Sequence, residues 1–305
     1  MFLISLYLIG VNLLGCSSFL CQPLIKLRRF DARDKPAHVN NELDFTRASS
    51  TFLFMSTSQV QIPKSAAERT NQAISAVKAA LSSPRFKTFP LVECEFPALE
   101  ALNKLGDGSL RSTQQAEEAN LDFAVKLSKS LAPFPLMASF KVWLVTSSSA
   151  SASFHSKAEK AIKGSQILPR SLRSGLPQAN PEDIVVLVTP SARTDYQAAE
   201  ILSKASTKGV VVINGFAKEP KSISPQATMA YFLKPLTYNS QVAGYLTRFY
   251  PGQWNTVDGV TGSVLSSVSD EEILVRGTNT PDLRPSGRLV QKAVDDRAIR
   301  ARQGF

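Results

Sequence analysis

Few side chains in this 305-residue sequence have the types and spacing of a catalytic centre. There are two histidines, His38 and His155, and three cysteines, Cys16, Cys21 and Cys94, and they do not combine with carboxylates at metal-ligand spacing. The sequence contains no phosphate loop, no dinucleotide-binding glycine pattern and no nucleophile elbow. We therefore predict no catalytic residue, no metal site and no cofactor. The sequence favours a non-enzymatic protein and leaves an enzyme open.

The histidine and the cysteine of the folded body have structural interpretations. His155 is the single histidine beyond residue 58, and a lone histidine is more often structural or solvated than catalytic. Cys94 alternates with apolar residues on an expected strand, which predicts a buried, inert thiol. With one cysteine left after the N-terminal segment, a disulfide-stapled extracellular protein is not expected.

Hydroxyl, amide and guanidinium groups follow three of the expected strands. Ser147, Ser191, Arg193 and Asn214 all lie directly after a strand pattern. In open α/β sheets, ligands bind beyond the carboxyl ends of the strands, and hydroxyls with helix N-termini hold anions there. These four residues are our candidates for an anion site. The alternative interpretation is ordinary helix capping.

Aromatic residues and arginine are concentrated in the stretch YLTRFYPGQW, residues 245–254. Such residues are the usual anchors of protein interfaces, so Tyr245, Arg248, Tyr250 and Trp254 are candidates for binding a partner. The alternative is that the strand ends in a type II turn at Pro-Gly, with Trp254 packed on the core.

The elements that position these residues alternate in type. Helical spacing, short apolar runs and turn residues predict helices over 64–81, 113–131, about 154–162 and 194–206, strands over 90–97, 140–146, 183–190 and 209–215, and an irregular segment over 164–181. The strand over 90–97 is expected to have one solvent-exposed face. This alternation predicts a Rossmann-like, three-layer α/β sheet.

The pattern changes after residue 215. Strands are expected over 229–236, 242–250 and 272–276 with no helix between them, which predicts an antiparallel extension. A charged terminal helix is expected over 285–302. We predict a single α/β domain over 59–288, followed by a basic C-terminal helix or tail over 289–305.

The N-terminal segment has the composition of a two-part targeting sequence. The apolar run over 2–14 is shorter than the roughly 20 residues of a spanning helix, and Cys16 and Ser18 suit a signal-peptidase cut before Phe19. Residues 19–58 are basic at first and then rich in serine and threonine, as in a transit peptide. We predict a signal peptide over 1–18 and a disordered transit-like segment over 19–58. A lipoprotein signal and ordinary secretion stay open.

The net charge of +10 indicates a basic surface, which attracts nucleic acid, anionic lipid or acidic protein. Lysine and arginine are not interleaved with aromatic residues in a stripe, so we do not expect nucleic-acid binding. Peripheral membrane association remains open.

Several segments in a fixed order resemble a known family. They are the helix after Pro63 with Gln72-Ala73, LVECEFP, TPSARTDYQAAEIL leading to VVVING, YFLKPL, RFYPGQW and Arg284-Pro285-Ser286. In this order they are similar to a plastid and cyanobacterial family of unknown biochemical activity. The family includes the low-photosystem-II-accumulation proteins of plants, and a related domain is appended to a plastid adenylate kinase. The resemblance covers about residues 62–288, and Tyr-Pro-Gly-x-Trp is its most specific part.

The resemblance implies a role in photosystem II assembly or thylakoid biogenesis, at the stroma or the thylakoid surface. A phenylalanine after the signal cut is similar to the presequences of algae with secondary plastids, so we expect that location. The expected partner is a photosystem II assembly intermediate or another thylakoid protein. The resemblance supplies no catalytic residues, and the family often has Asn-Pro where this chain has Asn214-Gly215. The alternative function is a nucleotide- or anion-binding α/β protein that uses the strand-end loops.

Overall fold

The structure, a computed structural model, describes residues 60–83, 89–97, 110–133, 139–205, 208–215 and 224–303. All of them belong to one compact unit, Met55–Phe305. The predicted signal peptide and the whole of the transit-like segment lie outside the described residues.

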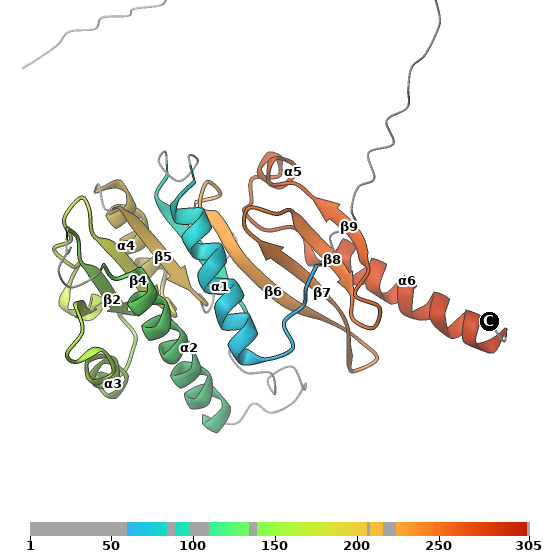
Figure 1. The fold of residues 1–305 in the computed structure, drawn as a ribbon, viewed down its shortest axis with the longest axis horizontal. Coiled ribbons are helices and arrows are strands. Elements are labelled where there is room, and N and C mark those ends of the chain that lie inside the picture. The colour runs from blue at the N-terminus through green and yellow to red at the C-terminus, as the bar shows by residue number, and fades with distance from the viewer. Residues whose placement is uncertain are drawn as a thin grey trace, which may run out of the picture. The chain divides into compact units, whose positions relative to one another are not determined.

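One mixed sheet of nine strands organises the described part of this unit, with the order β3-β2-β4-β5-β1-β6-β7-β8-β9 (Figure 1). The first six strands in this order run parallel, and β7, β8 and β9 continue the sheet antiparallel. The strands are β1 (Leu91–Glu95), β2 (Val142–Thr146), β3 (Ile167–Ser171), β4 (Ile184–Val188), β5 (Gly209–Ile213), β6 (Thr228–Tyr238), β7 (Gln241–Phe249), β8 (Trp254–Asp258) and β9 (Val264–Val268). The predicted α/β class and the antiparallel extension are therefore confirmed.

Helices cover both faces of the sheet. The helices are α1 (Ala66–Leu81), α2 (Leu110–Leu131), α3 (Ala152–Ile162), α4 (Arg193–Lys204), α5 (Asp270–Val275) and α6 (Leu283–Arg302), with a 3₁₀ turn over Leu172–Ser174. The first three share one buried cluster and so cover one face, which we call the α1 face. On the opposite face, α4 covers the parallel strands, while α5 and α6 cover β6 to β8. No described helix is both long enough and apolar enough to span a membrane.

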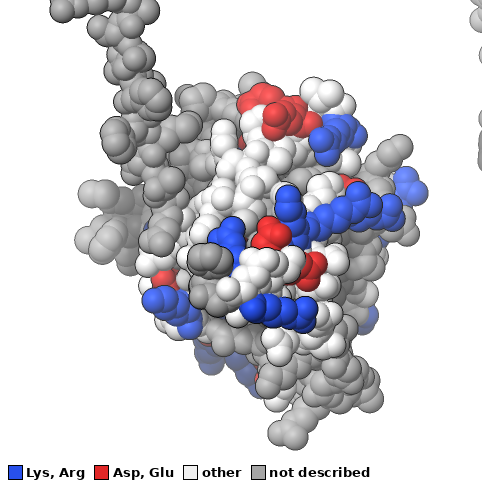
Figure 2. Space-filling view, turned by 90° about the vertical axis from the view of Figure 1, so that its right-hand side faces the viewer, with Lys and Arg blue, Asp and Glu red and all other residues white. Residues whose placement is uncertain are grey.

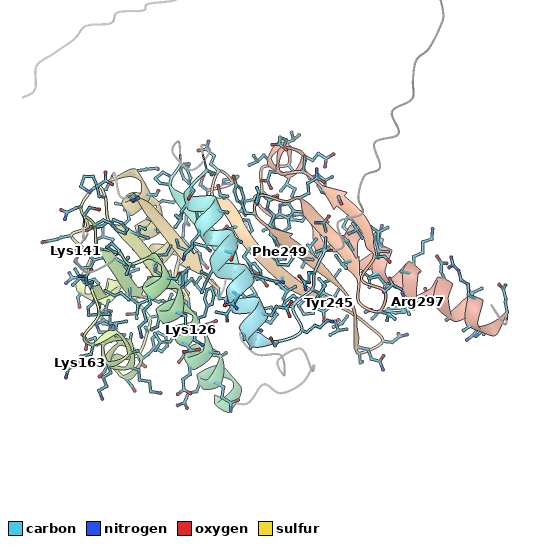
Figure 3. All side chains as sticks on the ribbon, viewed as in Figure 1. Lys126, Lys141, Lys163, Tyr245, Phe249 and Arg297 are labelled. Atoms are coloured by element: carbon cyan, nitrogen blue, oxygen red, sulfur yellow. The ribbon has the colours of Figure 1, made fainter. Side chains whose placement is uncertain are left out.

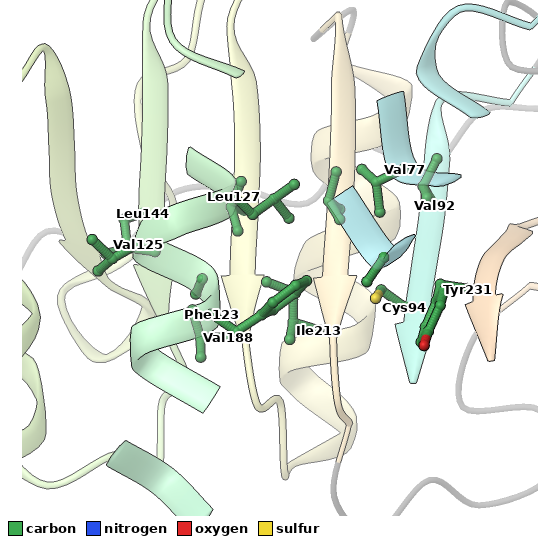
Figure 4. Packing of buried hydrophobic residues seen from close by; sticks show 14 of the residues in the cluster. Val77, Val92, Cys94, Phe123, Val125, Leu127, Leu144, Val188, Ile213 and Tyr231 are labelled. Atoms are coloured by element: carbon green, nitrogen blue, oxygen red, sulfur yellow. The ribbon is translucent and has the colours of Figure 1, made fainter. Parts of the chain in front are cut away.

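Aliphatic side chains fill the layer between the α1 face and its helices. Figure 4 shows Val77 of α1 above Val92, and Phe123 of α2 beside Val188 and Ile213. Strands β4 and β5 are buried along their whole length. Continuous burial explains why both have uninterrupted apolar sequences, since helices cover both faces.

Side-chain caps begin several helices where the sequence changes from loop to helix. The Ser65 hydroxyl accepts a hydrogen bond from the Glu68 N–H at 3.1 Å, and Ser151 accepts one from the Phe154 N–H at 3.1 Å. Asp282 caps α6 by accepting from the Arg284 N–H at 3.0 Å. Each cap satisfies a helix N–H that has no partner within the helix.

Three local predictions are wrong. The segment over 164–181 was expected to be irregular but contains β3, an edge strand. Its Pro169 and Arg170 interrupt the apolar pattern by which strands are recognised in a sequence. Residues 272–275 lie in α5 and Arg276 caps its end, because Ser269 and Glu272 form a capping box that starts a helix. The expected solvent-exposed face of β1 is buried, since β1 lies between β5 and β6 and helices cover both faces. Strands β8 and β9 were not expected from the sequence.

Candidate functional site

Polar side chains meet at the carboxyl ends of β2 and β4, around the carboxylate of Asp195. The Ser147 hydroxyl donates to Asp195 Oδ2 at 2.6 Å, and the Ser148 N–H donates to Oδ1 at 3.0 Å. The N–H groups of Ser191 and Ala192 donate to Oδ2 at 3.1 and 3.2 Å. Burial would raise the pKa of Asp195, but the hydrogen bonds from Ser147, Ser148 and Ser191 outweigh burial and hold it below its ordinary value.

This arrangement brings together two of the four anion-site candidates. Ser147 Oγ and Ser191 Oγ lie 3.2 Å apart, but the anion that they surround is the chain's own Asp195 carboxylate. Arg193 is exposed at the start of α4, and none of the described hydrogen bonds joins it to this cluster. The sequence pattern located the cluster but missed Asp195, which has the spacing of an ordinary helix-capping residue.

Asn214, the fourth anion-site candidate, has a different set of partners. Its Oδ1 accepts from the Phe96 N–H at 2.7 Å, and its Nδ2 donates to Asn120 Oδ1 at 2.7 Å. Its backbone has a φ of 43°, a left-handed conformation that asparagine tolerates better than most residues. Asn214 thus connects the end of β5 to β1 and α2.

His155 takes part in a hydroxyl–imidazole–carboxylate series. His155 Nδ1 lies 3.1 Å from Thr146 Oγ1, and His155 Nε2 lies 3.4 Å from Glu159 Oε1. The order is that of a nucleophile, a base and an orienting acid. Thr146, however, is fully buried and has no open side for a substrate, so the series joins β2 to α3.

Cys94 is buried under α1 (Figure 4), as the sequence predicts. Burial, and to a lesser extent the Glu95 carboxylate, raises the pKa of its thiol well above the ordinary value. The thiol therefore stays protonated. Among the described residues, no group of three or more histidine, cysteine, aspartate or glutamate side chains could hold a metal ion.

Two of the partner-binding candidates lie inside the protein, on the face opposite α1. Arg248 is 3% exposed and Trp254 is 1% exposed. Arg248 Nη2 lies 2.6 Å from Asp270 Oδ2, and Trp254 Nε1 donates to Asp270 Oδ1 at 3.1 Å. Arg248 also donates to the backbone carbonyls of Met229 and Gly252. These contacts join β6, β7, β8 and the start of α5.

The packing of Trp254 agrees with the alternative interpretation from the sequence, in which this residue is part of the core. Its ring lies 5.1 Å from the Phe232 ring. The turn before it differs from the expected type II turn, because the Tyr250–Pro251 peptide is cis and Gly252 has no positive φ.

The other two candidates, Tyr245 and Tyr250, are half-buried and pack against the core of the α1 face. Successive residues of a strand point to opposite faces, so Tyr245 and Phe249 point away from Arg248. Figure 3 shows Tyr245 and Phe249 on the part of the sheet beside α1. Of the two tyrosines, Tyr245 lines a groove.

This groove, which we call the α1 groove, has a volume of about 1180 Å³. Its floor is formed by four side chains of β6 and β7, Leu233, Pro235, Val242 and Tyr245. One wall consists of residues 60–65 and Arg69, and the opposite wall consists of residues 258–262 at the β8–β9 turn. The groove therefore combines an apolar floor with walls of mixed polar and apolar residues.

Two buried charged residues support the walls. Arg69 is 9% exposed, and its guanidinium lies 5.1 Å from the centre of the Phe96 ring. Asp258 accepts hydrogen bonds from the N–H groups of Val260 and Thr261 at 2.8 and 3.0 Å and pairs with Arg297 of α6. Burial opposes ionisation of Asp258, but these partners outweigh burial and lower its pKa.

The described geometry offers a surface for binding, whereas the polar groups at the strand ends are engaged with one another. Sequence reasoning found Tyr245 but missed the rest of the α1 groove. The groove brings together residues near 62, 97, 235 and 260, and only the order of the strands places them side by side.

Comparison with known proteins gives one match. No curated protein and no solved structure matches the chain. A family model described as a domain of unknown function, DUF1995, matches residues 63–272, which is more than half of the sequence. The match begins just before α1 and ends within α5. The chain therefore belongs to the DUF1995 family, whose function is unknown.

Proposed function

We propose that this protein is a non-enzymatic plastid factor that binds another protein through the α1 groove and assists photosystem II assembly or thylakoid biogenesis. The observation that carries the proposal is the groove, with its apolar floor on β6 and β7 and polar residues within its walls. An interface of this kind buries apolar side chains at its centre and keeps a polar rim.

The occupant that suits this groove is an extended segment of the partner protein. Val242 on the floor is 37% exposed and Tyr245 is half-buried, so an apolar side chain of the partner can cover both. Lys64 on one wall is cationic and exposed, which favours an acidic residue beside the apolar one. Arg248 and Trp254 act indirectly, by holding β6, β7 and β8 in place beneath the groove.

The plastid location and the link to photosystem II rest on the sequence. The two-part character of residues 1–58 supports import into a secondary plastid, and the resemblance over residues 62–288 supports a role in photosystem II assembly. The stroma or the thylakoid surface is the location that agrees with both.

The alternative, nucleotide or anion binding at the strand ends, gains no support from the described geometry. Ser147 and the N–H groups of Ser191 and Ala192 already donate to Asp195. An anion placed there would meet a carboxylate of the same charge.

Gene deletion with complementation tests the proposal. Loss of the gene is expected to lower photosystem II accumulation, and the wild-type chain is expected to restore it. Val242→Lys places a charge on the groove floor and is expected to fail, whereas Ile201→Lys is the matched control, because Ile201 is 54% exposed on α4. Normal photosystem II levels without the gene would refute the function. Full rescue by Val242→Lys would refute the groove as its site.

A further inference from the structure

The two edges of the described sheet differ in how they are protected. The edge strand β3 contains Pro169 and Arg170, whereas β9 has the sequence VLSSV, without charge or proline. Charged residues and proline are common means of blocking the addition of another strand to an edge. A bulge at Leu265 shifts the pairing of β9 with β8. Within the described residues, no further strand pairs with the outer side of β9.

Backbone groups of β9 point away from the sheet. The Ser263 carbonyl accepts from the Asp258 N–H at 2.9 Å, toward β8. Hydrogen-bonding directions alternate along an antiparallel strand, so the N–H and C=O of the next residue, Val264, point outward. Its side chain is also accessible, with 40% exposure.

Helix α6 adds a cationic surface beside this edge. Figure 1 shows the C-terminal half of α6 extending past β9. Ser286 and Val290 are its buried residues, and at 3.6 residues per turn the same side of the helix continues through Arg297 to Arg300. Arg300 and Arg302 are exposed, and no acidic residue follows Asp296 in the sequence. Figure 2, which faces this side, shows Lys and Arg side chains interspersed with Asp and Glu side chains.

We propose that β9 is a docking edge that takes an extended, acidic segment of another protein as an additional strand. Main-chain hydrogen bonds to β9 would supply affinity, as in other cases of strand addition. The arginines near the end of α6 would favour acidic side chains on the added segment. This surface is separate from the α1 groove, and the proposal stands whether or not the groove binds a partner.

A second copy of this chain is a poorer occupant. Antiparallel pairing of two β9 strands about a two-fold axis places both copies of α6 on the same face of the combined sheet. Each α6 extends past its own edge, so the two helices would meet with like charges.

The test uses the full chain and two synthetic seven-residue peptides, in which valine alternates with glutamate or with lysine. We expect the glutamate peptide to bind about tenfold more tightly than the lysine peptide at low ionic strength. We also expect it to slow amide hydrogen exchange within residues 264–268. Fluorescence anisotropy measures the affinities, and exchange detected by mass spectrometry locates the contact.

Three variants test the two parts of the proposal. Val264→Pro removes an outward N–H and is expected to abolish binding, while Val264→Thr keeps that N–H and is expected to bind like the wild type. Arg300→Glu is expected to weaken the glutamate peptide about tenfold. Melting curves check that each variant is folded, and Val242→Lys in the α1 groove is expected to leave the peptide's protection of residues 264–268 unchanged.

Four outcomes would overturn the proposal. Absence of binding by the glutamate peptide would do so, as would equal affinity for the two peptides. Binding that Val242→Lys abolishes would place the peptide in the groove instead. A concentration-dependent dimer that protects residues 264–268 without peptide would identify a second copy as the occupant.

Discussion

Replacing Asp270 by alanine removes the acceptor shared by two buried side chains. Asp270 Oδ2 lies 2.6 Å from Arg248 Nη2, and Asp270 Oδ1 accepts from Trp254 Nε1 at 3.1 Å. The Arg248 side chain is 3% exposed, and that of Asp270 is 21% exposed. After the substitution, a guanidinium group that water scarcely reaches loses the carboxylate that balances its charge.

The expected cost follows from these burial values. Removing one partner of a buried ion pair costs about 3–5 kcal/mol, because the remaining charge stays desolvated. The Trp254 N–H also loses its acceptor, which costs about 1–3 kcal/mol for a buried donor. Asp270 is partly exposed, so water can enter and replace part of both interactions. We therefore expect the free energy of unfolding to fall by about 3 kcal/mol.

Equilibrium unfolding in urea, followed by circular dichroism, measures this change. Lys126→Ala is the matched control, because its pair with Asp122 joins two side chains that are 55% and 63% exposed. The control is expected to change the free energy of unfolding by less than about 1 kcal/mol. The double variant Arg248→Met/Asp270→Leu is expected to be more stable than Asp270→Ala, because it buries no unpaired charge.

Two results would refute this reasoning. If Asp270→Ala costs no more than the exposed control pair, the Arg248–Asp270 contact does not hold the charge in a desolvated place. If the double variant is less stable than Asp270→Ala by the full cost of removing Arg248, the two side chains act independently and the pair has no coupling.

Three further substitutions test other parts of the described fold by the same unfolding measurement. Trp254→Ala is expected to cost about 3–5 kcal/mol as a large core truncation, and an unchanged stability would mean that the ring is not buried. Asp195→Asn is expected to reduce the loss of stability below about pH 4. A carboxylate with a lowered pKa stabilises the fold above its unfolded pKa, and this effect is lost as the pH falls through the folded pKa. If the free energy of unfolding of the variant depends on acid pH in the same way as that of the wild type, the hydrogen bonds to Asp195 do not stabilise its charged form. Gly244→Ala is expected to cost about 1–3 kcal/mol, because a Cβ there would lie 2.5 Å from the Val257 carbonyl oxygen and 2.6 Å from Val290 of α6. An unchanged free energy of unfolding would show that α6 packs less closely on β7.

Local patterns predicted most helices and the buried parallel strands, because their periodicity reflects burial on one or both sides. The pattern failed where the environment of an element is set by distant segments. For β1, Glu93 alternates like a solvent-exposed residue, but it is 4% exposed and accepts from the Asn279 side chain. The sequence between residues 93 and 279 gives no sign of this contact, which depends on the position of β1 between β5 and β6.

For the candidate anion site, the sequence predicted where the polar residues lie but not what they bind. Ser147 and Ser191 were placed at the carboxyl ends of strands from the sequence, and the structure makes those strands, β2 and β4, neighbours. Whether their hydroxyls face a ligand or the protein itself depends on Asp195, in the first turn of α4. A capping carboxylate and an anion site draw on the same donors, so residue types alone do not separate them.

The stretch 245–254 illustrates how one strand serves two faces. Alternation along β7 sends Tyr245 to the α1 groove and Arg248 to the opposite face, where Asp270 holds it. The buried contacts of Arg248 and Trp254 hold β7, the strand that contains Tyr245, against its neighbours β6 and β8. A substitution at Arg248 is therefore expected to weaken partner binding through loss of fold stability, whereas one at Val242 is expected to weaken it with stability intact. A melting curve measured beside each binding assay separates the two effects.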